Sequence, residues 1–146
     1  MAGVDVTAEI DIGAAPADVA AVMFDPQREP EWVKAVSRVE LLDAELRPGA
    51  RVERHGTLFG REMTWVTEVE SVHFPHALSL TIVQGPFLGT LRYDIQRSAT
   101  GSRARIRSAG DASHFGPLPS AMIAAPLRAA LAADLGRLKA IVERTA

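Results

Sequence analysis

The feature that most constrains the fold of this chain is an apolar stripe near its C-terminus. Between Pro117 and Ala146, apolar side chains recur at steps of four, four, three and four residues. They are Leu127, Leu131, Leu135, Leu138 and Val142. This spacing places them on one face of an α-helix, and charged residues, Asp134 among them, fall mostly on the solvent side. A long helix with one apolar stripe needs a partner surface that buries it.

Alternating apolar and polar residues predict that this partner surface is an antiparallel β-sheet. The cleanest alternation runs from Val4 to Ile12. Six later strands are expected at Val39–Leu42, Ala50–Phe59, Met63–Val69, Leu78–Ile82, Leu91–Gln96 and Ala104–Ser108. Two short helices should follow the first strand, from Pro16 to about Asp25 and from about Pro30 to Val36. The fold class is therefore α+β, with one sheet curved around one long helix.

Composition limits what such a chain can do. Its 146 residues suit one domain, spanning 1–146, and the formal charge of −2 gives no basic field to attract nucleic acid. The absence of cysteine excludes disulfides and thiolate chemistry. No apolar run is long enough for a membrane span, and the acidic N-terminus is unlike a signal peptide. We expect a soluble, cytoplasmic protein with no nucleic-acid partner.

Several stretches resemble those of one known superfamily. They are Ile10–Val19, Phe24–Pro26, Trp32–Val33, Pro48–Val52, Trp65–Val69, Pro75 and Asp134–Lys139. On these residues the chain resembles the START-like superfamily, also called SRPBCC, and within it the polyketide cyclase/dehydratase branch. The resemblance implies a helix-grip fold, in which a seven-stranded antiparallel sheet wraps around the C-terminal helix and leaves a hydrophobic tunnel. It also implies polyketides, lipids, sterols or other apolar molecules as ligands.

The inward faces of the predicted elements supply candidate ligand-binding residues. They are Phe24, Trp32, Val36, Leu58, Met63, Trp65, Thr67, Leu80, Phe87, Leu91, Ser108, Met122, Ile123 and Leu127, with Ile82 and Ile106 also expected on the dry face. Periodicity identifies a dry face without locating a hollow, so some of these side chains form only core. Gly56 and Gly89 remove side-chain volume, which makes room or, more in keeping with sheets, permits a bend.

Two inward polar residues are candidates for catalysis. Arg54 lies on the drier side of its predicted strand, where its charge could hold a carbonyl or enolate oxygen. Tyr93 could donate or relay a proton. The alternative is structural: Arg54 extends its charged end to solvent or pairs with Glu53 or Glu68, and the Tyr93 hydroxyl is satisfied at the rim of the cavity.

The histidines give little support for a metal site, and we expect no metal and no cofactor. His73 and His76 flank Pro75 without a third ligand, and catalytic zinc takes three protein ligands. His55 is predicted on the outer face of the sheet. His114 and Asp111 lie near the expected tunnel mouth, where they could act as a base and its orienting group or form a simple surface pair.

One strand carries a basic stripe on its outer face, made of Arg103, Arg105 and Arg107. Cross-strand ion pairs with Glu62, Glu68, Glu70 and Asp94 explain this stripe better than a nucleic-acid surface does.

Pro126 should break or kink the helix near Ala125. The segment Leu118–Ala125, together with Phe87, Leu88 and the Trp32 segment, is then predicted to gate the tunnel.

Three functions remain open. The first is binding of a hydrophobic small molecule, such as a lipid, a polyketide or an isoprenoid-like compound, in the tunnel. The second is a polyketide cyclase/dehydratase-type reaction in the same pocket. The third, a cofactor for a protein partner, has no basic or exposed apolar signature to support it. The sequence carries no oligomerisation signature, so a homodimer also stays open.

Overall fold

A computed structural model of the protein describes residues 3–58, 60–111 and 120–145. The strands are β1 (Gly3–Ile12), β2 (Val36–Leu41), β3 (Arg51–Leu58), β4 (Arg61–His73), β5 (Ala77–Gln84), β6 (Leu88–Ser98) and β7 (Gly101–Asp111). The helices are α1 (Pro16–Met23), the 3-10 helix η1 (Pro26–Arg28), α2 (Glu29–Trp32) and α3 (Ser120–Thr145). This element order confirms the predicted α+β class.

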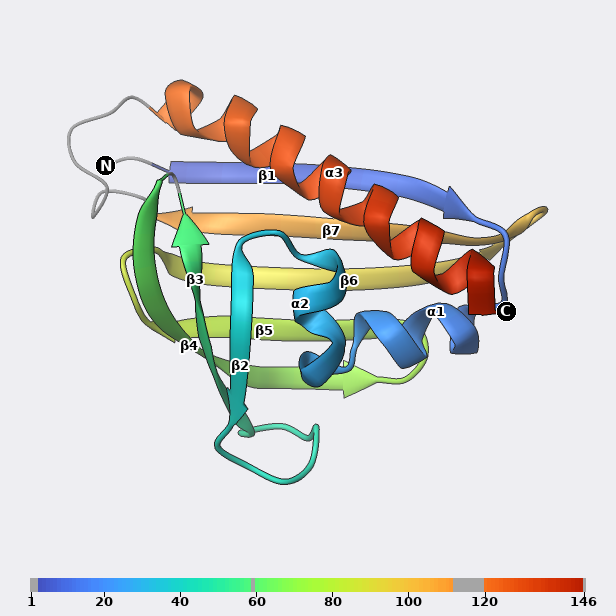
Figure 1. The fold of residues 1–146 in the computed structure, drawn as a ribbon, viewed down its shortest axis with the longest axis horizontal. Helices are drawn as coiled ribbons and strands as arrows, with labels where there is room; N and C mark the ends of the chain where they lie inside the picture. The colour runs from blue at the N-terminus through green and yellow to red at the C-terminus, as the bar shows by residue number, and fades with distance from the viewer. Residues whose placement is uncertain (1–2, 59, 112–119, 146) are drawn as a thin grey trace.

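All seven strands form one antiparallel sheet in the order β1-β7-β6-β5-β4-β3-β2. The sheet curves, and α1, α2 and the long α3 all lie on its inner side (Figure 1). The predicted helix-grip architecture is therefore confirmed, including the two short helical segments after the first strand.

The apolar stripe of α3 forms the centre of the core, as its spacing predicted. Leu135 and Leu138 are fully buried, and Val142 is 1% exposed. They pack in one cluster with the inward residues of β1 and β7, such as Val6 and Ile106. Each such side chain contributes about 1.5–3 kcal/mol on burial, so this stripe fixes the position of α3 on the sheet.

Of the two outcomes predicted at Pro126, a break or a kink, the break does not occur. The helix runs continuously from Ser120 to Thr145 with Pro126 inside it. Proline removes the hydrogen bond to the carbonyl four residues earlier, which belongs to Met122. Because Met122 and Pro126 are both exposed, water can satisfy that carbonyl. The missing bond therefore falls where it costs least.

The short helices after β1 begin and end at other residues than predicted. Helix α1 ends at Met23, and the Asp25 side chain accepts a hydrogen bond from the Gln27 backbone N–H at 3.0 Å, which starts η1. Val33 adopts an extended conformation and ends α2 at Trp32. The second short helix is therefore earlier and shorter than the predicted Pro30–Val36, and β2 begins at Val36 instead of Val39.

Gly56 has a steric role that differs from the predicted bending. A Cβ atom at this position would lie 1.7 Å from the carbonyl oxygen of Ala35, and this same oxygen accepts a hydrogen bond from Thr57 N at 2.8 Å. Gly89 is similar, because its Cβ would lie 2.2 Å from the oxygen of Ala109. Both glycines permit a close approach of two backbones.

The arginine stripe of β7 forms cross-strand ion pairs, as predicted, but mostly with other partners. Arg103 pairs with Asp11 and Arg107 pairs with Asp5, both on β1, while Arg105 pairs with the predicted Asp94 on β6. The glutamates Glu62, Glu68 and Glu70 lie on β4, which is not a neighbour of β7 in the sheet. The prediction failed because strand order, and with it the list of neighbours, is not visible in the alternation pattern.

Candidate functional site

An apolar pocket of about 120 Å³ lies between the inner face of the sheet and the first half of α3. We call it the sheet–helix pocket. Eight of its lining residues were predicted: Leu58, Trp65, Ile82, Phe87, Leu91, Ser108, Ile123 and Leu127. Pro86 and Leu131 complete it. The pocket thus draws on strands β3 to β7, on the β5–β6 turn and on α3.

Ser108 carries the only hydroxyl among the described lining residues of this pocket. It is 5% exposed and lies directly opposite Leu91 in the β6–β7 ladder. A single hydroxyl in an otherwise apolar lining can orient one polar oxygen of a ligand. Ligand contact by any of these side chains remains a prediction.

Other predicted ligand-binding residues lie elsewhere. Those that are buried in the core outside the pocket lining are Trp32, Val36, Thr67 and Leu80. Phe24 lines a different hollow, Met63 faces Gly56 across the β3–β4 ladder beside a shallow polar depression, and Met122 is 61% exposed. Periodicity assigned most of these residues to the dry side, but it could not separate the lining of a hollow from solid core.

A buried polar cluster, made of Glu29, Arg54, Thr67 and Tyr93, adjoins the sheet–helix pocket. Arg54 Nε donates to Glu29 Oε1 at 2.8 Å, and Arg54 Nη1 donates to Thr67 Oγ1. Trp65, which lines the pocket, lies directly opposite Arg54 in the β3–β4 ladder. Arg54 and Tyr93 are each 4% exposed. Tyr93 lies close enough to Glu29 and Arg54 to feel both charges. The two candidate catalytic residues are therefore brought together, but neither lines the pocket.

Charge in this cluster is balanced by pairing. Burial alone would lower the pKa of Arg54, but the charge and hydrogen bond of Glu29 outweigh it, so the pKa is raised and the guanidinium stays charged. Burial raises the pKa of the Tyr93 hydroxyl, and the Glu29 carboxylate raises it further. Tyr93 therefore keeps its proton and can serve as a donor but not as a base.

Trp32 packs against this cluster. Its ring lies edge-on to that of Tyr93, with 6.0 Å between the ring centroids, and Phe24 stacks on Tyr93 at 6.4 Å. The Trp32 indole N–H is buried and has no hydrogen-bond partner among the described residues. Because Trp32 is only 1% exposed and does not line the pocket, it does not gate the pocket as predicted.

The rest of the predicted gate is only partly described. Phe87 lines the pocket and Leu88 is 41% exposed, in keeping with the mouth of a cavity. Residues 118 and 119 of the predicted lid, together with His114, lie outside the described residues.

Asp134 on α3 holds the segment that follows α2. Its Oδ1 accepts a hydrogen bond from Lys34 N at 3.2 Å and pairs with Arg137, whose Nε donates to the Trp32 carbonyl at 3.0 Å. Asp134 is only 6% exposed, so its predicted place on the solvent face was wrong. It was misassigned because the α2–β2 segment covers that part of the helix.

Sequence reasoning also missed Glu29, the partner of Arg54. Glu29 lies in a polar, proline-flanked stretch that is typical of exposed chain, and the expected partners Glu53 and Glu68 point elsewhere. The one signal was Arg54 itself, because a charge on a dry face needs a buried partner of opposite sign.

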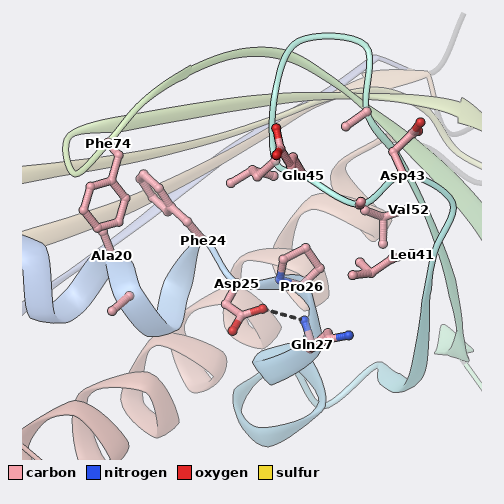
Figure 2. A pocket seen from close by; sticks show the side chains of 14 residues that line it. Ala20, Phe24, Asp25, Pro26, Gln27, Leu41, Asp43, Glu45, Val52 and Phe74 are labelled. Atoms are coloured by element: carbon pink, nitrogen blue, oxygen red, sulfur yellow. Dashed lines mark hydrogen bonds between the residues drawn. The ribbon is translucent and has the colours of Figure 1, made fainter.

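A second and larger hollow lies between α1–η1 and the chain that joins β2 to β3. Its volume is about 350 Å³. Figure 2 shows the side chains that line it. Its apolar walls include Ala20, Phe24, Leu41, Leu46, Val52 and Phe74. Three acidic residues, Asp25, Asp43 and Glu45, also line it. We call this feature the acidic-rimmed hollow.

The three described histidines, His55, His73 and His76, lie outside the linings of both cavities. His76 Nδ1 bonds the Ile95 carbonyl at 3.0 Å. His55 comes within ligand distance of Glu40 and Glu53, and its Nε2 lies 2.7 Å from Glu53 Oε1. In the described part of the chain this is the one group of three side chains that could share a metal ion. Glu40 is exposed, and Glu53 and His55 are half-buried. The group does not include His73 or His76, which had little support in the sequence as metal ligands.

Among the described residues, no helix combines the length and apolar character needed to cross a membrane.

Comparison with solved structures shows the same fold in several proteins. A START superfamily protein from Mycobacterium smegmatis aligns with a TM-score of 0.82 and 17% identity, covering 99% of both chains. The TTHA0849 protein from Thermus thermophilus aligns with a TM-score of 0.78 and 17% identity, also over 99% of both chains. Protein Ms6760 from Mycobacterium smegmatis aligns with a TM-score of 0.73 and 19% identity, covering 98% of this chain and 93% of that one. At these identities the likeness concerns the fold alone.

A search of curated protein sequences finds no match to this chain. The sequence model of one family, described as polyketide cyclase/dehydrase and lipid transport, matches residues 3–143. The helix-grip fold, the pocket between sheet and α3 and this nearly full-length match agree with one another. Its fold is that of a START superfamily protein. The chain belongs to the polyketide cyclase/dehydrase and lipid transport family.

Proposed function

We propose that the protein binds a hydrophobic small molecule in the sheet–helix pocket. The observation that carries this proposal is the lining itself, in which one hydroxyl, Ser108, stands among apolar side chains from five strands and α3. Binding is favourable because an apolar ligand leaves water for an apolar cavity.

The volume sets the size of the bound group. An engineered apolar cavity of about 150 Å³ binds benzene, so a pocket of about 120 Å³ suits a single ring or a short branched chain. A longer lipid or polyketide would place such a group here and would need Phe87 and α3 to move apart. The ligand class is therefore an apolar ring or isoprenoid-like unit with one polar oxygen facing Ser108.

Isothermal titration calorimetry with toluene and p-cresol tests this proposal. The two ligands differ by one hydroxyl, so their affinities separate the apolar lining from the Ser108 hydrogen bond. Ser108→Ala should lower the affinity for p-cresol by about three- to tenfold, which is the contribution of one hydrogen bond, and should leave the affinity for toluene unchanged. Leu127→Trp should fill the pocket and abolish binding of both ligands. Ala132→Trp is the matched control, because Ala132 is exposed on the same helix. Binding that survives Leu127→Trp would contradict the proposal.

A second candidate is a cyclase/dehydratase-type reaction, favoured by the buried polar cluster. Enolisation of a β-dicarbonyl compound needs an acceptor for the α-proton, positive charge near the oxygen and a group that protonates this oxygen. Arg54 would supply the charge and the protonated Tyr93 would give its proton to the enolate oxygen, while water would take the α-proton and return it to Tyr93. A substrate large enough to extend from the pocket past Trp65 would come next to both.

Exchange of the α-protons of benzoylacetone in deuterium oxide, followed by NMR, tests this second candidate. An enzyme should accelerate exchange, and Tyr93→Phe should reduce the acceleration by at least about 100-fold, the lower range for general acid–base catalysis. If benzoylacetone binds but its α-protons exchange no faster than in free solution, the enzymatic function is contradicted and the binding function is not.

A further inference from the structure

The acidic-rimmed hollow differs from the sheet–helix pocket in place, size and charge. It lies at the junction of α1, η1 and the chain between β2 and β3, and its volume of about 350 Å³ falls within the range of small-molecule sites. Phe74 reaches it from the β4–β5 turn (Figure 2). The proposed function does not involve this region.

Two of the large apolar side chains that line the hollow remain exposed. Phe74 is 59% exposed and Leu41 is 37% exposed. The Phe74 ring stands edge-on to Phe24, with 6.1 Å between the centroids. One side of Phe74 therefore packs on Phe24, and the rest of its ring is exposed to solvent. Ala20 and Ala21 contribute little volume, and this leaves room beside the two rings. An apolar body bound here would cover surface that is otherwise in contact with water.

The charges around the hollow all have the same sign. Asp25 comes from the start of η1, whereas Asp43 and Glu45 come from the opposite wall, and no lysine or arginine is among the described residues that line the space (Figure 2). Within the described chain none of the three carboxylates takes part in an ion pair. Arg28 lies close enough to Asp25 to interact with its charge, but its guanidinium pairs with Glu31 at 3.0 Å.

Two of these carboxylates are held in place. Asp25 Oδ1 accepts a hydrogen bond from Gln27 N at 3.0 Å, and Asp43 Oδ2 accepts one from Arg51 N at 2.7 Å. A fixed carboxylate loses less conformational entropy when it binds a cation. The site is therefore organised before any ligand arrives.

We propose that the acidic-rimmed hollow binds an organic cation that joins an ammonium group to an apolar body. The apolar body would lie against Phe24 and Phe74, where the aromatic faces also attract a cation. The ammonium group would lie among Asp25, Asp43 and Glu45. A carboxylate ligand of the same shape is excluded by repulsion, and a neutral one lacks the electrostatic contribution.

Three probes of nearly equal shape test this assignment in amide NMR titrations of the full chain. They are 2-phenylethylammonium, 2-phenylethanol and phenylacetate. The ammonium compound should shift the amides of Phe24, Gln27 and Ala44 and bind at least about tenfold more tightly than the alcohol, while phenylacetate should not shift them. Raising the salt concentration from about 20 to about 200 mM should weaken binding of the ammonium compound alone, because salt screens its attraction to the carboxylates.

Charge-neutral variants locate the site. The Glu45 carboxylate holds no hydrogen bond in the described structure, so Glu45→Gln removes charge without breaking one. This variant should lower the affinity for the ammonium compound about threefold to tenfold, and the double variant Asp43→Asn/Glu45→Gln should lower it further. Glu9→Gln/Glu62→Gln is the control, because it removes as many exposed carboxylates elsewhere. Equal affinity for the three probes, insensitivity to Glu45→Gln, or shifts confined to Trp65 and Leu91 would overturn the assignment.

Discussion

Arg54 and Glu29 form an ion pair in the interior, with 2.8 Å between Nε and Oε1 and with side chains only 5% and 8% exposed. The pair joins the inner face of β3 to α2, and it brings positive charge to the edge of the sheet–helix pocket. Because both charges are buried, the contribution of the pair to stability can be tested by removing one partner or both.

Glu29→Leu alone should lower the free energy of unfolding by about 3–5 kcal/mol, because it leaves the Arg54 charge buried without a partner. The double variant Glu29→Leu/Arg54→Met should recover most of that loss, since an apolar pair of similar volume needs no compensation. Urea unfolding measures both. If the double variant is no more stable than Glu29→Leu, the pair is not the source of the penalty.

Gly56→Ala should destabilise the protein by about 1–3 kcal/mol or more, because the new methyl group overlaps the Ala35 carbonyl and pushes β2 away from β3. Gly136→Ala is the matched control. Gly136 is exposed within α3, and a Cβ atom there meets nothing within 4 Å, so this variant should gain about 0.5–1 kcal/mol. Thermal unfolding of the two variants should shift in opposite directions, and a neutral Gly56→Ala would contradict the close-approach role.

Leu138→Ala should cost about 2–5 kcal/mol, because Leu138 is fully buried in the centre of the stripe. Leu127→Ala should cost clearly less, since Leu127 is only partly buried and borders a cavity that already exists. Denaturant unfolding of the two variants compares them. Equal costs would mean that the first half of α3 is packed as tightly as the second half.

Asp134 should make the protein less stable as pH rises. Burial is the main cause that raises its pKa above the ordinary value of 3.8, and Glu29 adds to the shift, while the Lys34 N–H and Arg137 act against it. Because the folded state holds this proton more tightly than the unfolded state, folding loses stability as pH rises from about 3.8 through the raised pKa.

The stability difference between wild type and Asp134→Asn isolates this effect from the other carboxylates. That difference should move against the wild type across this pH window and be flat above it. A difference that moves in favour of the wild type would show that Arg137 dominates and that the pKa of Asp134 is lowered instead.

Much of the fold followed from the sequence because the periodic patterns of β1, β7 and α3 are local. Val4 to Ile12 alternates so regularly that the buried face of β1 could be assigned directly. The apolar stripe through Leu138 identified the buried face of α3 in the same way. Family resemblance supplied the helix-grip arrangement. The ends of α1 and α2 were less visible, because they depend on an Asp25 cap and on the extended Val33.

The candidate site was only partly predictable, because hollows arise where elements fail to fill the space between them. Leu91 and Leu80 have the same pattern on neighbouring strands, yet only Leu91 lines the pocket. Glu29 and Asp134 were missed because each is buried by a segment far away in sequence. The acidic-rimmed hollow depends on side chains from four separate segments, so no local pattern marks it.

The central claim, that an apolar molecule binds between the sheet and α3, is tested most directly by an isotope-filtered NOE experiment. Toluene is added to protein with labelled methyl groups. The structure predicts cross-peaks to the methyl groups of Leu91, Ile123 and Leu127, and none to those of Leu41 or Val52 in the acidic-rimmed hollow. Cross-peaks only to Leu41 and Val52, or none at saturating toluene, would contradict binding in the sheet–helix pocket.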